Sequence, residues 1–389
     1  MNQRDFSEIK RRLNPDHRNP TIIRGCYVSG DGQVISSFMQ AVGSMAQDEN
    51  EKYMALFRRT LSGAPGQNLL PIDFSVEQVN DSEEYRLLDT LVGSALTDEN
   101  AVDAFCQRVI GYVQDCHSEG AQSVDDAQNE ANYLVLMLHD GYDIPFRDTN
   151  GEIDRERSLD VLRYMLCCVC PVKRAKPALR YIASEGEFHS RESDWVVGAP
   201  DLGFMFPAYE ERGANISRAI YYTRDASDLH EGFVQRVFNA PLQMNAAEQK
   251  ETFQSLLRDT LQEECSLNVM QQMHETVSTM IEEQKADKTA EPLTLSKREV
   301  KKVLEECGVS EEKAAAFEER YEEAFGEKAQ IAAVNIIEPK QFRVSTPSVS
   351  IKVDPDHSDL IETRVIDGKC YIMILCDGEV EVNGMQISG

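Results

Sequence analysis

The densest apolar and aromatic runs of the chain lie between Tyr133 and Arg224, and polar turns separate them. These runs read YLVLMLHDGYDIPF, VLRYMLCCVCPV, DWVVGAPDLGFMFPAYEERG and ISRAIYYTR. Leu134–Leu138 is a continuous apolar segment of strand length, which predicts a strand buried on both faces. Because several such segments follow one another, we expect a central β-sheet in this part of the chain.

Helical periodicity flanks that sheet. Apolar residues recur at three- and four-residue steps in 4–13, 49–61, 81–92 and 100–116, and again from 245 to about 285. Ser82 or Asp81 is the expected cap of the helix at 81–92, and Asp98 that of the helix at 100–116. Ser296 and Glu299 form a capping box, and Ser310 is the expected cap of the next helix, so residues 296–326 predict a helical hairpin.

The tail from residue 332 to residue 389 returns to strand-like alternation and predicts about five short strands. We therefore expect an α+β (mixed α/β) protein in three parts. Residues 1–240 form an α/β domain around a central mixed sheet, residues 241–328 a helical segment, and residues 329–389 a small β domain.

The 389-residue chain carries a formal net charge of −27 at pH 7. A field of that sign repels phosphate and argues against general binding to nucleic acid or to an anionic membrane. The first residues lack the apolar core of a signal peptide, and no apolar run is long enough to span a bilayer. Together with ten cysteines that we expect to be reduced thiols, this predicts a cytoplasmic protein.

His139, Asp140 and Asp143 follow the buried run Leu134–Leu138. Strand ends are where open α/β sheets place functional side chains, and a histidine with two carboxylates suits acid–base or divalent-metal chemistry. The same HDGYD segment is also compatible with an ordinary turn. We take these three residues as the candidate catalytic site, and the sequence identifies neither a metal nor a cofactor.

Cys167 and Cys170 have the CxxC spacing of a redox or zinc site. Strand alternation would point the two thiols to opposite faces, and a second cysteine pair at matching spacing is absent. We therefore expect buried, unreactive side chains.

Charge is distributed unevenly. Residues 1–24 carry six basic and three acidic residues, and Lys10, Arg11, Arg12 and Arg18 are candidates for RNA or ribosome contact. Alternatively, this segment pairs with the protein's own acidic surface, because residues 119–160 hold 11 acidic and three basic residues. Residues 305–327 hold nine acidic and two basic residues, which suits a solvated face or a docking face for a basic protein.

The chain also contains the phrases SEIKRRLNPD, TIIRGCYV, RRTLSGAPGQNL, CCVCPVKRAKPAL, DWVVGAPDLGFMFPAYEERGANI, AEQKETFQSLL and LIETRVIDGKCYIMI. These phrases span nearly the whole chain and closely resemble a bacterial family described only as a domain of unknown function, family four-three-one-seven. The resemblance implies a bacterial cytosolic protein. It carries no activity, cofactor or catalytic residue over to individual positions.

Three hypotheses follow. The leading one is a non-enzymatic protein that binds another macromolecule, most readily another protein, through its helical segment and β tail. The alternative is a hydrolase-type or metal-dependent enzyme with its site near His139. The third is a ribosome- or RNA-associated factor that uses the basic N-terminal segment. The oligomeric state is left open.

Overall fold

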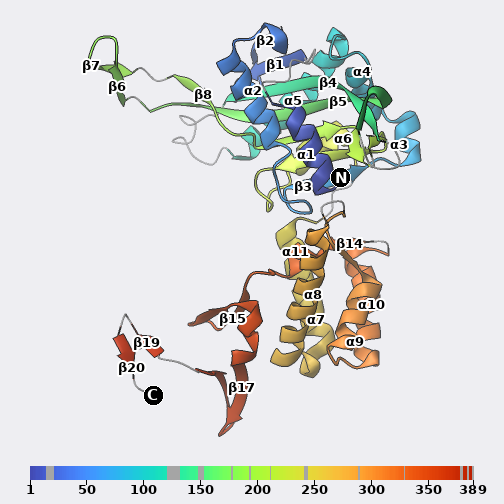
Figure 1. Ribbon diagram of the computed structural model, residues 1–389, viewed down its shortest axis with the longest axis vertical. Coiled ribbons are helices and arrows are strands. Elements are labelled where there is room, and N and C mark those ends of the chain that lie inside the picture. The colour runs from blue at the N-terminus through green and yellow to red at the C-terminus, as the bar shows by residue number, and fades with distance from the viewer. Residues whose placement is uncertain are drawn as a thin grey trace. The chain divides into compact units, whose positions relative to one another are not determined.

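The computed structural model describes the whole chain except residues 15–21, 121–131, 148–152, 177, 192–193, 211, 241–243, 288–289, 328, 377–379, 383–384 and 388–389. The segment Thr149-Asn150-Gly151, whose Asn-Gly pair predicts a hairpin turn, lies outside the described residues. The chain divides into two compact units, Met1–Asn245 and Ala246–Gly389 (Figure 1). It is an α+β protein, as the sequence predicts.

The first unit is built on one sheet of eight strands, in the order β2-β1-β4-β5-β9-β12-β3, with β8 paired to β5. Its strands are β1 (Ile22–Val28), β2 (Val34–Ala41), β3 (Leu69–Asp73), β4 (Asn132–Arg147), β5 (Ile153–Arg174), β8 (Trp195–Val197), β9 (Leu202–Phe206) and β12 (Arg218–Thr223). Between the described residues every ladder of this sheet is antiparallel, so the sheet itself is not mixed, contrary to the expectation from the sequence. The predicted strand at 134–138 is confirmed as part of β4, and the apolar run VLRYMLCCVCPV lies in β5.

Helices cover both faces of the sheet, which is why its central strands are apolar without alternation. On one face, α1 (Gln3–Arg12) and α2 (Gln47–Arg59) pack against Leu134, Leu136 and Leu138. On the other face, α4 (Glu83–Gly93), α5 (Glu99–Gly120) and α6 (Glu231–Phe238) pack against Val135 and Met137. The short helix α3 (Val76–Asp81) precedes α4.

Two of the predicted caps are confirmed in this unit. The Ser82 hydroxyl accepts the backbone N–H of Tyr85 at 3.0 Å, and Asp98 Oδ1 accepts that of Ala101 at 3.1 Å. Each bond satisfies one of the amide donors that the first turn of a helix leaves without an intrahelical partner.

Two small hairpins complete the unit. One pairs β10 (Ala208–Glu210) with β11 (Gly213–Asn215). The other pairs β6 (Ala178–Ile182) with β7 (Glu187–Arg191), and Figure 1 shows it standing away from the central sheet.

The second unit has a helical core. Helices α7 (Ala246–Leu261), α8 (Leu267–Ala286), α9 (Lys297–Glu306) and α10 (Glu311–Phe325) bury one hydrophobic cluster, which includes Phe253 and Phe317. Two short strands, β13 (Thr294–Ser296) and β14 (Gln330–Ala332), and helix α11 (Ala333–Ile336) lie beside it. The capping box of Ser296 and Glu299 is confirmed.

Ser310 takes the N-cap position of α10, but its side chain makes no capping bond. Its hydroxyl donates instead to Glu264 Oε1 at 2.8 Å, and its backbone N–H donates to Oε2 of the same carboxylate at 2.9 Å. The predicted capping bond of Ser310 is therefore wrong, because a carboxylate from the α7–α8 connection, 46 residues away in the chain, binds both groups.

The tail forms three separate hairpins: β15 (Phe342–Ser345) with β16 (Ser350–Val353), β17 (Ile361–Ile366) with β18 (Lys369–Ile374), and β19 (Val380–Val382) with β20 (Met385–Ile387). Ile331, Ala333 and Ile336 belong to the helical core, beyond the boundary expected at residue 328. Division of the second unit at that boundary stays a prediction.

Candidate functional site

His139 and Asp140 lie inside β4, not in a turn, because β4 continues to pair with β5 beyond them as far as Arg147. Consecutive residues of a strand point to opposite faces of the sheet. Asp140 therefore faces α1, whereas His139 faces the opposite helical layer. The strand geometry separates the two side chains that sequence reasoning had paired.

His139 is buried at 8% exposure, and among the described residues its Nε2 has no hydrogen-bond partner. Burial lowers the pKa of His139, against the raising effect of the Asp140 charge. Asp143 is exposed and shares the His139 face, at about 13 Å along the strand. A catalytic role for His139, Asp140 and Asp143 stays a prediction.

Asp140 is the centre of a buried polar network under α1. Arg12 Nε donates to Asp140 Oδ2 at 2.7 Å, and Arg12 Nη2 donates to Oδ1 at 3.2 Å and to the Gly141 carbonyl at 3.1 Å. The Tyr164 hydroxyl donates to Asp140 Oδ2 at 3.0 Å. Burial lowers the Arg12 pKa, but the bonds to Asp140 more than offset this and raise it overall.

A second carboxylate, Glu8 on α1, extends the network. The hydroxyls of Tyr142 and Tyr209 both donate to Glu8 Oε1, the latter at 3.1 Å, and the Arg12 guanidinium lies 4.5 Å above the Tyr142 ring. Burial and the Glu8 carboxylate raise the pKa of both tyrosines. Both phenols therefore stay protonated and act as hydrogen-bond donors, not as bases. Their bonds to Glu8 attach α1 to the strands that carry the two tyrosines, β4 and β10.

The same network includes one of the basic N-terminal residues that the sequence suggests for RNA or ribosome contact. Arg12 is engaged by Asp140, which agrees with the alternative that the segment pairs with the protein's own acidic residues. Lys10 is partly buried, which lowers its pKa, and Arg11 is exposed. Arg18 lies outside the described residues. RNA or ribosome binding through these four residues stays a prediction.

The cysteines divide between the two faces of the sheet. Cys167 belongs to the core under α4, α5 and α6, whereas Cys168 and Cys170 belong to the core under α1 and α2. All three are free and fully buried, and burial raises the pKa of Cys168 well above its usual value. The expectation of buried thiols on opposite faces is confirmed.

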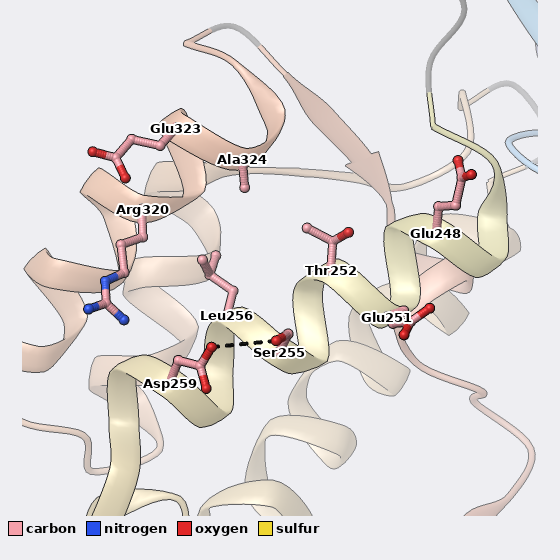
Figure 2. A pocket seen from close by; sticks show the side chains of 9 residues that line it. All are labelled: Glu248, Glu251, Thr252, Ser255, Leu256, Asp259, Arg320, Glu323 and Ala324. Carbon is pink, nitrogen blue, oxygen red and sulfur yellow. Dashed lines mark hydrogen bonds between the residues drawn. The ribbon is translucent and has the colours of Figure 1, made fainter.

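The second unit contains an open groove between α7 and α10, with a cavity volume of about 620 Å³. Figure 2 shows that α7 contributes most of the lining and that Arg320, Glu323 and Ala324 come from α10. The α7 residues that line it are Glu248, Glu251, Thr252, Ser255, Leu256 and Asp259. Their three- and four-residue spacing places them on one face of that helix.

The groove is acidic at its rim and apolar at its centre. Four carboxylates and one guanidinium line it, while the half-buried Leu256 and Ala324 provide its apolar surface. Ser255 donates to Asp259 Oδ2 at 3.5 Å, and Arg320 Nη1 donates to the Thr260 hydroxyl at 3.4 Å. Arg320, the cation among the lining residues, thus hydrogen-bonds the neutral hydroxyl of Thr260.

The two sides of α10 differ in charge compensation. On the side facing α9, Glu318 pairs with Lys301 at 3.0 Å and Glu322 pairs with Lys297. On the groove, no ion pair joins Glu251, Asp259 or Glu323 to a cation within the described part of the chain. These exposed, uncompensated carboxylates produce a local negative potential that attracts a cationic group from outside.

Sequence reasoning identified the acidic character of 305–327 but not the α7 half of the groove. A signal existed, because Glu248, Glu251 and Asp259 share one face of a helix whose opposite face is apolar.

Among the described residues, no group of three or more His, Cys, Asp and Glu side chains has an arrangement that could hold a metal ion. No helix in the described ranges combines the length and hydropathy that crossing a membrane requires.

A family model covers residues 1–385 of the chain, under the description Domain of unknown function (DUF4317). The chain belongs to this family. The match confirms the resemblance seen in the sequence phrases and extends over both structural units. No curated protein matches the DUF4317 chain.

Proposed function

We propose that this DUF4317 protein binds another protein, and that the α7–α10 groove takes a basic segment of that partner. The observation that carries the proposal is the set of uncompensated carboxylates, Glu251, Asp259 and Glu323, around the apolar side chain of Leu256. A segment with lysine or arginine on either side of one apolar residue fits this arrangement. Its cations would lie against the rim, and its apolar side chain would lie against Leu256.

The charge contrast within α10 supports this assignment. Charges on helices are commonly compensated by neighbours of opposite sign, as Glu318 and Glu322 of α10 are by the lysines of α9 where these two helices meet. The groove side instead combines three carboxylates that form no ion pair with any described residue with a concave surface and partly buried apolar atoms. An interface of this composition has an apolar centre and a polar rim, as is usual for protein recognition.

The test uses the full-length chain and a fluorescein-labelled peptide that places lysines and arginines around a central leucine. We expect binding by fluorescence anisotropy that weakens as salt is added, because exposed charges are screened within about 10 Å at 0.1 M ionic strength. The triple variant Glu251→Gln/Asp259→Asn/Glu323→Gln should weaken binding about tenfold. This follows from three exposed ion pairs at roughly 0.5 kcal/mol each.

The matched control is Glu305→Gln/Glu312→Gln/Glu319→Gln, which removes the same charge from exposed positions of the same unit outside the groove. It should retain the affinity of the unaltered chain. Equal losses in the two triple variants would mean that net charge alone attracts the peptide. Absence of binding at low salt would also refute the groove as the docking site.

A further inference from the structure

Residues 173–197 form an exposed arm of the first unit, made of the end of β5, the hairpin β6–β7, and β8. Figure 1 shows the hairpin standing away from the central sheet. In residues 178–190 every side chain is exposed except that of Ile182, which is half-buried. None of these residues belongs to either hydrophobic core of the unit. Packing therefore does not explain which residue types the hairpin carries.

One face of the hairpin carries large apolar and aromatic side chains. Leu179, Tyr181 and Phe188 are exposed at 74%, 57% and 68%. Tyr181 pairs with Phe188 across the hairpin, and their ring centroids lie 5.2 Å apart at an interplanar angle of 52°. Strand alternation places Leu179 on the same face as Tyr181. Because the two rings are exposed, they offer faces on which another planar group can stack.

The root of the arm carries a third ring and three cations. Trp195 pairs with Arg174 in the β5–β8 ladder, and the Arg174 guanidinium lies 5.0 Å from the centre of the Trp195 ring. Lys173 and Lys176 are exposed, as is Arg174. Within the described part of the chain, no ion pair joins any of these three cations to a carboxylate, since the ion pairs of the arm belong to His189. Their charges are therefore available to a ligand from outside.

Exposed rings beside uncompensated cations are the combination that binds single-stranded nucleic acid. The cations attract phosphates, and nucleobases stack on the rings because every nucleobase has a π-face. In a duplex those faces are already stacked on their neighbours, so the rings select a single strand.

We propose that the arm binds single-stranded nucleic acid. Nucleobases stack on Tyr181 and Phe188, and phosphates lie against the three cations at the root. This activity is separate from peptide binding in the α7–α10 groove, which belongs to the second unit.

The net charge of −27 does not prevent binding at this position. Salt screens exposed charges beyond about 10 Å at 0.1 M ionic strength. Each five-residue strand of the hairpin is about 17 Å long, so much of the hairpin lies beyond the reach of the acidic residues around the central sheet. A local positive surface on an acidic chain also confines binding to that surface.

The turn of the hairpin argues against a lipid surface as the ligand. Glu185 and Glu187 are exposed at the turn, and His189 Nε2 lies 3.0 Å and 3.7 Å from their carboxylates. A hairpin that inserted Tyr181 and Phe188 into a bilayer would first bring these carboxylates to anionic headgroups, which repel them. A single strand can instead lie across the ring face and leave the turn in water.

The test measures binding of the full-length chain to a fluorescein-labelled oligouridylate of about 12 nucleotides, a length within the usual range of single-strand sites. We expect fluorescence anisotropy to report binding that weakens as salt is added. Trp195, the one tryptophan of the chain, lies at the root of the arm, so its emission should change on binding. Oligothymidylate of the same length is the second probe. Tighter binding of oligouridylate assigns the ligand to RNA, and tighter binding of oligothymidylate assigns it to DNA.

Replacing the rings separates stacking from plain apolar contact. Tyr181→Ile/Phe188→Ile keeps apolar side chains that suit a strand but removes both aromatic faces. Oligonucleotide binding should weaken about tenfold or more, because stacking on each ring contributes to affinity. Both positions are exposed, and an unchanged urea midpoint verifies that the variant folds.

Replacing the cations tests the phosphate contacts. Lys173→Gln/Arg174→Gln/Lys176→Gln should reduce the slope of log affinity against log salt by about 2, at roughly 0.7 for each phosphate contact of a single strand. A matched control should keep the slope of the unaltered chain. It removes the same charge from exposed positions of the same unit outside the arm, as Arg4→Gln/Lys52→Gln/Arg59→Gln.

Three outcomes would overturn the proposal. If neither oligonucleotide binds at low salt, the arm has another ligand. If Tyr181→Ile/Phe188→Ile binds as tightly as the unaltered chain, the rings serve only as apolar surface, as in contact with a protein. If the two triple variants lose the same slope, overall charge attracts the strand and the arm does not.

Discussion

Replacing Arg12 by methionine isolates the contribution of the buried network under α1. Methionine keeps an unbranched side chain of similar helix propensity, so the backbone and the hydrophobic contacts of α1 are retained. Among the contacts of Arg12 with described residues, the change removes two hydrogen bonds to Asp140, one to the Gly141 carbonyl and the contact over the Tyr142 ring. It leaves the Asp140 carboxylate buried, with only the Tyr164 hydroxyl among the donors described above.

The magnitude follows from the burial of the pair. Removing one partner of a buried ion pair costs about 3–5 kcal/mol, because the remaining charge is uncompensated. The Asp140 side chain is 3% exposed and that of Arg12 is 16% exposed, so some water reaches the guanidinium. We therefore expect the lower end, about 3 kcal/mol of unfolding free energy.

The assay is urea unfolding of the full-length chain followed by tryptophan fluorescence. The chain has one tryptophan, Trp195, and it lies in the first unit, so its signal reports unfolding of the unit that contains Arg12. Arg11→Met is the matched control, because Arg11 is the exposed neighbour on the same helix. Its unfolding free energy should change by no more than about 0.5 kcal/mol.

A second substitution tests the mechanism of the loss. Asp140→Asn in the Arg12→Met background removes the uncompensated charge and should recover about 1–2 kcal/mol of the lost stability. If Arg12→Met costs less than about 1 kcal/mol, or if Asp140→Asn recovers nothing, the network is not a buried ion pair in solution and the reasoning fails.

Two further predictions concern buried groups. Because burial lowers the folded-state pKa of His139, the unfolded chain binds the extra proton, so stability falls as pH drops below about 6.5. His139→Leu should flatten this part of the stability–pH curve and cost about 1 kcal/mol near pH 8, because it removes the hydrogen bond between His139 and the Val92 backbone, and an unchanged slope would contradict the assignment. Thiol titration of the native chain should modify the exposed Cys116, Cys370 and Cys376 rapidly and leave Cys167, Cys168 and Cys170 unreacted until urea is added. Rapid native reaction at any of these three would show that the sheet opens.

The parts of the fold that sequence predicts are those with a local physical cause. The run Leu134–Leu138 indicates a buried strand because both faces need apolar side chains, and Ser82, Asp98 and Ser296 indicate helix starts because their oxygens satisfy nearby amides. Ser310 does not make its predicted capping bond, because Glu264, distant in sequence, accepts hydrogen bonds from its hydroxyl and from its backbone N–H.

The candidate sites depend more strongly on contacts between distant segments. Arg12 and Asp140 are 128 residues apart, so local pattern could suggest only that the basic segment meets some acidic surface. The groove likewise needs residues of α7 and α10 side by side, and the sequence of 305–327 supplies only its α10 part. Strand alternation alone, in contrast, separates His139 from Asp140, once HDGYD is placed in a strand and not in a turn.

Strand β5 has a consequence for how the first unit comes apart. Its alternate side chains enter both hydrophobic cores, with Cys167 and Val169 on one side and Cys168 and Cys170 on the other. Neither helical layer can detach without exposing half of this strand, and moving the strand disrupts both layers together. The amide protons in the middle of β5 should therefore exchange with solvent only when the whole unit unfolds, which makes the two cores a single cooperative folding unit.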